Sequence, residues 1–196
     1  VDYQERFYAT GRLAGGRFNK REGRPSTSSI LASRLIDRPI RPMFPKGVMN
    51  SVQIIPTIFS ATGKSDFSFW GITGASIAIQ LAGLHEFEEA VSGVRIALDA
   101  NGHWIFDPTF KAIKNAKCEL LVAGTATEIT MVEFQGNEVP EEDVVSGFER
   151  AQEILAELSA AQADFIETYK KSFEITSLDL SKKEENTELE QQVMSH

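Results

Sequence analysis

The sequence is poor in several residue types and patterns, and each absence excludes a class of protein. The 196 residues contain one cysteine, Cys118, so no disulfide can form within the chain, which suits a reducing compartment. No apolar run approaches the roughly 20 residues of a membrane-spanning helix, and no basic and then apolar signal segment opens the chain. The three histidines stand far apart, with no second histidine or cysteine at ligand spacing. We therefore expect a cytoplasmic protein with no membrane span and no metal site in this chain.

Basic residues are fewer than acidic ones, 20 against 28, which gives a net charge of −8. The basic residues are also unevenly distributed along the chain. Residues 1–46 contain ten Lys and Arg against four Asp and Glu, whereas residues 47–196 contain ten against twenty-four. Eight of the early basic residues are arginines, whose planar guanidinium groups bind phosphate through paired hydrogen bonds. An acidic chain that concentrates arginine in one segment is expected to bind a polyanion there.

The first half of the chain carries the patterns of two strands, a glycine-rich loop and two helices, which we place at 1–10, 51–60, 12–25, 30–38 and 65–82. One of the serines at 26–29 would cap the first helix, and Pro39 would end it. Ser65 and Asp66 would cap the second helix, whose centre is apolar and rich in small residues. Such a helix is expected to be buried and to let a neighbouring backbone come close.

The second half carries the patterns of two hairpins and two helices, with strands at 94–98, 104–106, 119–123 and 129–134 and helices at 109–115 and 141–171. With 42% hydrophobic residues, the chain can bury a core. We expect an α+β fold, an α/β sandwich of sheet and helices, over 1–171. Residues 172–196 are polar and are interpreted as a linker or the start of a helical unit.

Three arginines gather around the first predicted helix. Arg34 and Arg38 are one helical turn apart and so lie on one face, and Arg41 follows just beyond Pro39. Arginines held together repel one another unless an anion neutralises them. Two interpretations are open: they bind a polyanion, or acidic side chains from the rest of the chain pair with them.

The glycine-rich loop supplies a second basic cluster. Phe18 stands beside Lys20 and Arg21, with Arg24 shortly after, so an aromatic face adjoins phosphate donors. That combination is typical of single-stranded nucleic-acid binding. The alternative is that Phe18 merely packs onto the core.

Several motifs in this order resemble the polynucleotide phosphorylase family. They are Tyr3-Gln4-Glu5-Arg6, Arg21-Glu22-Gly23-Arg24-Pro25-Ser26, Arg34-Leu35-Ile36-Asp37-Arg38-Pro39-Ile40-Arg41-Pro42, Gly74-Ala75-Ser76 and Val122-Ala123-Gly124-Thr125. The likeness is to the first of that family's two RNase PH-like core domains, which have the ribosomal protein S5 domain 2-like fold. It covers roughly residues 1–171, and the opening strands of that domain look missing, so we expect a fragment. Residues 172–196 look like the start of the family's all-helical domain.

The resemblance implies a phosphorolytic 3′–5′ exoribonuclease that takes part in RNA processing and mRNA degradation. Such enzymes use inorganic phosphate as co-substrate and Mg²⁺ as cofactor, release nucleoside diphosphates reversibly, and form a ring-shaped homotrimer around a channel for single-stranded RNA. They also have partners in RNA-decay machines.

The resemblance also assigns roles to residues of this sequence. The loop with Phe18, Lys20, Arg21 and Arg24 would grip RNA in the channel, although Asn19 replaces the family's second aromatic residue and Lys20 its first arginine. By the same likeness, Arg38 and Arg41 would contact RNA phosphates, with Arg34 supporting them.

Two features predict that this chain holds no catalytic residue. An active repeat has a serine run at the start of the helix with Gly-Ala-Ser, where phosphate binds, but this chain has Asp66 and bulky aromatics there. An active repeat also has Asp-x-Asp-x-Lys before Val-Ala-Gly-Thr, but here Glu119 is a lone acid and Leu121 stands in place of the lysine. Catalysis and the Mg²⁺ site are therefore expected in a second core outside this chain.

Two other functions are alternatives. The chain could instead come from a non-catalytic RNase PH-like subunit that binds RNA in a multi-chain ring, and a second core with intact motifs would decide against that. A small-molecule kinase lacks support, because no glycine-rich loop precedes a helix with Lys-Ser or Lys-Thr at phosphate-loop spacing.

Overall fold

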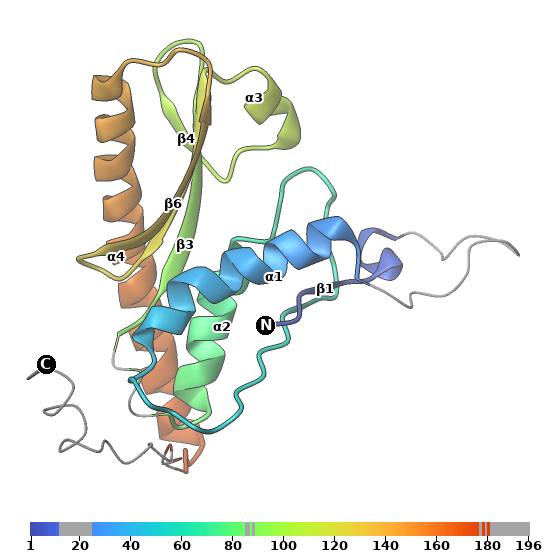
Figure 1. Cartoon of the computed structure of the whole chain (residues 1–196), viewed down its shortest axis with the longest axis vertical. Coiled ribbons are helices and arrows are strands. Elements are labelled where there is room, and N and C mark those ends of the chain that lie inside the picture. The colour runs from blue at the N-terminus through green and yellow to red at the C-terminus, as the bar shows by residue number, and fades with distance from the viewer. Residues whose placement is uncertain (12–24, 85–86, 88, 177, 179, 181–196) are drawn as a thin grey trace, which may run out of the picture.

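A four-stranded antiparallel sheet forms the centre of the molecule (Figure 1). The computed structural model describes residues 1–11, 25–84, 87, 89–176, 178 and 180. The sheet consists of β3 (Ser92–Leu98), β4 (Trp104–Phe106), β5 (Cys118–Gly124) and β6 (Ile129–Gly136), in the order β4-β3-β5-β6. Both predicted hairpins are therefore confirmed.

The turn between β3 and β4 explains why the first hairpin could be recognised. The carboxylate of Asp99 accepts the backbone N–H groups of Asn101 and His103, each at 2.8 Å. The bond from His103 and then that from Asn101 hold the pKa of Asp99 below its usual value. Gly102 follows at φ +86°, where a side chain would be strained.

Each face of the sheet has its own apolar core, and the two cores put helices on opposite sides (Figure 1). On one face, Val94 and Val122 pack against Ala151 and Leu155 of α4 (Glu141–Ser172). On the other face, the sheet meets α1 (Thr27–Ile40) and α2 (Trp70–Leu81). Because both faces are covered, β3 and β5 are buried almost throughout. The α/β sandwich of the prediction is confirmed.

The first predicted strands are largely wrong in extent. Only β1 (Gln4–Glu5) and β2 (Thr57–Ile58) pair, in parallel. After β1 the chain turns into the 3₁₀ helix η1 (Phe7–Thr10), where backbone bonds such as Ala9 N–H to Arg6 C=O replace a ladder. Pro56, directly before β2, has no N–H to donate, so the sequence predicted an edge strand or a bulge there. The strand β2 is indeed an edge strand, in a two-stranded sheet.

The helix α1 is longer than predicted at its C-terminal end. Ser26 caps it, because its hydroxyl oxygen accepts the Ser29 N–H at 3.1 Å, as expected. Pro39 does not end the helix but lies inside its last turn, and the Arg41 N–H still bonds to the Asp37 carbonyl. A proline there removes one hydrogen bond, and the complete burial of Pro39 against the core offsets that loss.

The helix α2 begins later than predicted, at Trp70, with Phe69 as its N-cap. Asp66 does not cap it, because its carboxylate accepts the backbone N–H and hydroxyl of Ser68 in a turn that precedes the helix. At Gly71 the group that comes close is a side chain and not the predicted backbone, because an added Cβ would lie 2.5 Å from Ile36 Cδ1. Gly74 faces open space.

The predicted helices at 109–115 and 141–171 are confirmed as α3 (Phe110–Lys114), which Thr109 caps, and α4. The 3₁₀ helix η2 (Arg41–Met43), which follows α1, was not predicted. After α4, the chain returns to the end of α2, where the Leu178 N–H donates to the Gly83 carbonyl at 2.9 Å. Among the helices that the structure describes, none is both long and apolar enough to cross a membrane.

Candidate nucleic-acid interface

The three arginines singled out in the sequence lie on the exposed side of α1 and at its C-cap, Arg41. Arg34, Arg38 and Arg41 are all exposed, at spacings of four and three residues. The opposite side of the helix is buried in the core through Ala32, Leu35, Ile36, Pro39 and Ile40. Burial of the apolar side therefore fixes the arginine side toward solvent, and the helix presents a row of guanidinium groups.

Two of these arginines have acidic partners on the surface. Arg38 Nη1 lies 2.8 Å from Glu133 Oε1 on β6, and these side chains are 49% and 48% exposed. Arg41 donates from Nε and Nη2 to Asp37 Oδ2, at 2.9 and 2.7 Å. In the part of the chain that the structure describes, no acidic group pairs with Arg34.

Internal pairing, one of the two interpretations of the arginines, thus holds for Arg38 and Arg41. Exposed pairs of this kind contribute only about 0–1 kcal/mol, so a phosphate can replace the carboxylate at low cost. The pairing therefore does not remove these side chains from a polyanion site.

A charged cavity of about 330 Å³ lies beside the arginine row. Its wall includes Arg34 and Arg38 from α1, Glu133 from β6, and Tyr3 and Glu5 from the start of the chain. Burial, and then the charges of Glu5 and Asp66, raise the pKa of the Tyr3 hydroxyl. The hydroxyl of Tyr3 is therefore neutral at physiological pH and does not add a negative charge.

Arg95 of β3 lies in the wall of the same cavity and joins two acids that are far apart in the sequence. Its Nη1 binds the Asp66 carboxylate before α2, and its Nη2 lies 3.3 Å from Glu119 Oε2 on β5. The three side chains are between 17% and 31% exposed, so they are shielded from water far more than Arg38 is. One guanidinium group thus ties together Asp66 and Glu119, the two acids that the sequence singled out.

The start of α2 gives little to an anion. The N–H groups of Trp70, Gly71 and Ile72 donate to the carbonyls of residues 67, 68 and 69, in that order. Helix starts bind phosphate through free N–H groups, and these are already bonded. Phe69 fills the space beside them and is completely buried. Within the described residues, no cluster of three or more His, Cys, Asp or Glu side chains could hold a metal ion.

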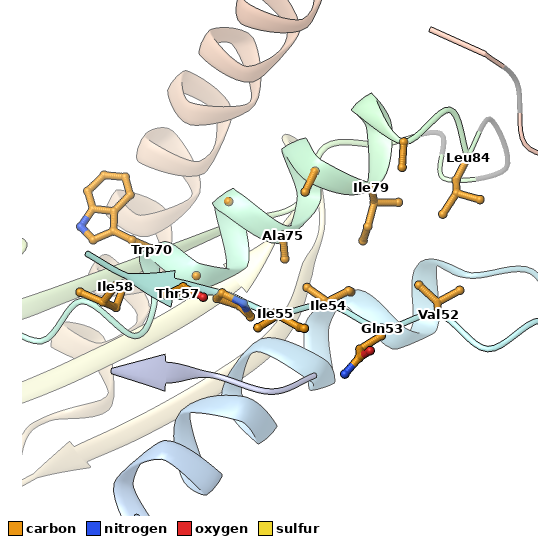
Figure 2. A pocket seen from close by; sticks show the side chains of 15 residues that line it. Val52, Gln53, Ile54, Ile55, Thr57, Ile58, Trp70, Ala75, Ile79 and Leu84 are labelled. Atoms are coloured by element: carbon orange, nitrogen blue, oxygen red, sulfur yellow. The ribbon is translucent and has the colours of Figure 1, made fainter. Parts of the chain in front are cut away.

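A second hollow of about 450 Å³, which the sequence did not reveal, is apolar (Figure 2). It lies between the extended segment 52–58 and α2, with Trp70 at one end and Leu84 at the other. Gly74 and Ala78 leave room there because their side chains are small. The apolar run around Pro56 and the small residues of α2 were the available signals. A lining without charged side chains does not suit phosphate.

The loop residues proposed from sequence cannot be placed. Phe18, Lys20, Arg21 and Arg24 lie outside the residues that the structure describes. The arginine row therefore carries the argument for this interface.

The comparisons with known proteins agree with the motifs. Residues 1–85 match the model of the 3′ exoribonuclease family, domain 1 (RNase PH). The polyribonucleotide nucleotidyltransferase of Fervidobacterium nodosum is 41% identical over 189 residues, which are 96% of this chain and 26% of that protein. The chain is similar to polyribonucleotide nucleotidyltransferases over most of its length. The predicted resemblance is thereby confirmed.

Two further relatives have the same name and show the same proportions. The polyribonucleotide nucleotidyltransferase of Gloeobacter violaceus is 43% identical and matches 87% of this chain and 23% of its own length. That of Heliobacterium modesticaldum is 39% identical and matches 100% of this chain and 27% of its own length. The chain thus spans about a quarter of the length of these curated polynucleotide phosphorylases.

The fold has a solved counterpart. The crystal structure of rice (Oryza sativa) Rrp46 superposes with a TM-score of 0.52 and covers 75% of this chain and 67% of that one. The sequences are 13% identical, so the likeness concerns the fold alone. Together with the family match, it confirms the predicted RNase PH-like α+β fold.

Proposed function

We propose that this chain is the RNA-holding part of a phosphorolytic 3′–5′ exoribonuclease of the polynucleotide phosphorylase type. The observation that carries the proposal is the exposed row of Arg34, Arg38 and Arg41 on α1, in a chain 39–43% identical to polyribonucleotide nucleotidyltransferases. The whole enzyme would release nucleoside diphosphates from the 3′ end of RNA, with inorganic phosphate as the attacking co-substrate.

The chemistry of the arginine row suits a backbone-binding role. Guanidinium groups donate paired hydrogen bonds to phosphate, and such contacts position a strand without reading its bases. Binding by this surface is therefore expected to tolerate any RNA sequence and to weaken as salt is added. An exoribonuclease that degrades RNA of any sequence needs the first property, because each nucleotide in turn must pass the same site.

The catalytic step is assigned to residues outside this chain. The Mg²⁺ ion that the family implies does not fit the residues present, because Glu119 is a single carboxylate already paired with Arg95. Asp66, which stands where phosphate would bind, is likewise neutralised by Arg95.

Assembly and location complete the proposal. A homotrimeric ring would bring three copies of the arginine row around one channel for single-stranded RNA, in a cytoplasmic enzyme that meets partners of RNA decay.

The neutralised Asp66 and Glu119 also fit a second candidate, a non-catalytic RNA-binding ring subunit. Phosphate-dependent release of nucleoside diphosphates by the whole polypeptide separates the two.

The test replaces the paired arginines. We expect the double variant Arg38→Ala, Arg41→Ala to bind oligouridylate and oligoadenylate more weakly to the same degree. The slope of log affinity against log salt should fall by about 0.7 for each lost phosphate contact. Fluorescence anisotropy at several salt concentrations measures both.

Arg150→Ala is the matched control, because Arg150 forms a surface pair with Glu153 on α4, a helix that covers the other face of the sheet. Its affinity for RNA should stay unchanged. Wild-type RNA binding by the Arg38, Arg41 double variant would mean that these arginines are structural and would remove the basis of the proposal.

A further inference from the structure

The side chain of Glu133 is held against α1 by the sheet. In β6, Met131 lies two residues before Glu133, on the same side of the strand, and Met131 is buried in the core that α1 shares. The strand therefore directs Glu133 toward α1, and its Oε1 reaches Arg38 Nη1 at 2.8 Å. This pair joins residues 95 positions apart in the sequence. Backbone register, rather than the chance rotamer of a surface side chain, places the carboxylate there.

A carboxylate and an RNA phosphate compete for the same donors. A carboxylate is planar and an RNA phosphate is tetrahedral, but each presents two anionic oxygens that accept guanidinium N–H bonds. As long as Glu133 accepts from Arg38, that N–H is closed to phosphate. Both side chains are half exposed, so a phosphate approaching from solvent can reach the pair.

The other two arginines of the row differ from Arg38. Arg34 has no acidic partner among the described residues, so it meets a phosphate directly. Asp37 and Arg41 lie on one helix at a spacing of four residues, and they move together. Within the described residues, only the Arg38 pair joins the arginine row to a different element of the fold.

We propose that Glu133 is a positioning residue that occupies Arg38 in the free protein and gives it up when an RNA phosphate arrives. This inference rests on the proposed function. Glu133 keeps the guanidinium group extended over β6, and it lowers the affinity for RNA, because the displaced carboxylate remains close to the incoming phosphate and repels it. At Arg38, an RNA phosphate thus takes the place of the Glu133 carboxylate. The lower affinity for RNA at this one residue favours release of the strand between successive rounds of nucleotide removal.

The test removes the charge of Glu133 and keeps its shape. We expect Glu133→Gln, in the whole polypeptide that carries this chain, to bind single-stranded oligouridylate about two- to fivefold more tightly at low salt. The gain should shrink as salt is added. Glu128→Gln is the matched control, since it makes the same charge change on an exposed residue in the turn before β6. It should leave the affinity within the error of the measurement.

A double-mutant cycle shows whether Glu133 acts through Arg38. In an Arg38→Ala background, Glu133→Gln should no longer tighten binding, because no guanidinium group is left to release. Equal effects of Glu133→Gln and Glu128→Gln would overturn the inference, and so would weaker binding by Glu133→Gln or a gain that persists without Arg38.

These failures differ from failure of the proposed function. If Arg38→Ala weakens RNA binding but Glu133→Gln changes nothing, the RNA site stands and only the role of Glu133 is lost. If Arg38→Ala itself binds RNA as the wild type does, both are lost. Unfolding midpoints of each variant, measured in urea, identify any change in affinity that comes from a destabilised fold.

Discussion

At the scale of single residues, Arg95 joins two acidic side chains that are far apart in the sequence. It neutralises Asp66 and Glu119, two acids that would otherwise repel each other in a poorly hydrated place. The arginines of α1 are the opposite case, because their pairs are exposed and cost little to break. Exposure, more than the presence of a partner, separates a binding arginine from a structural one.

This contrast makes a prediction for stability. Arg95→Met should lower the free energy of unfolding by about 2 kcal/mol, because it leaves two shielded carboxylates without a counter-charge. Arg150→Met removes an exposed arginine from a pair with Glu153 and should cost less than about 1 kcal/mol. Urea unfolding followed by circular dichroism measures both, and equal losses would show that the Arg95 pairs are not structural.

At the scale of elements, the sequence predicted those whose signals are local. The turn residues at 99–102 and the serine cap of α1 act within a few residues, and both hairpins and the helix start were found. Pro39 was misjudged because burial by distant residues decides whether a helix continues through a proline. The arginine row followed from helical spacing, but the partner of Arg38 did not, since Glu133 reaches it only through the sheet.

The helix α2 offers a prediction with its own control. Gly71→Ala places a Cβ 2.5 Å from the Cδ1 of the fully buried Ile36, and overpacking of this kind costs about 1–3 kcal/mol. Gly74→Ala meets nothing within 4 Å and should stabilise the helix by about 0.5–1 kcal/mol. Unfolding midpoints that shift in the same direction for both variants would contradict this packing of α1 on α2.

At the scale of the whole molecule, RNA binding and catalysis are expected to lie in different parts of a longer polypeptide. The chain spans about a quarter of the length of its curated relatives, and Asp66 and Glu119 are both paired with Arg95. RNA binding by this chain is therefore expected to need no metal ion, whereas the catalytic reaction of the whole polypeptide is expected to need one.

A chelator separates the two activities. EDTA should abolish phosphate-dependent release of nucleoside diphosphates by the whole polypeptide, since the proposed Mg²⁺ site serves the chemical step. The same treatment should leave the RNA affinity of the 196-residue chain unchanged, because no described cluster of side chains suits a metal ion. Weaker RNA binding by this chain after chelation would place a metal in the interface.

The contact between Gly83 and the chain that follows α4 has a mechanical consequence. Gly83 has φ +77°, and a Cβ there would overlap the Thr176 carbonyl oxygen, while its own carbonyl accepts the Leu178 N–H. Leu180 then packs against the core that contains α1 and α2. These contacts fasten the chain that follows α4 to the end of α2. A force that pulls on the chain beyond Leu180 must therefore break the contacts of Leu178 and Leu180 before it can unwind α4 from its C-terminal end.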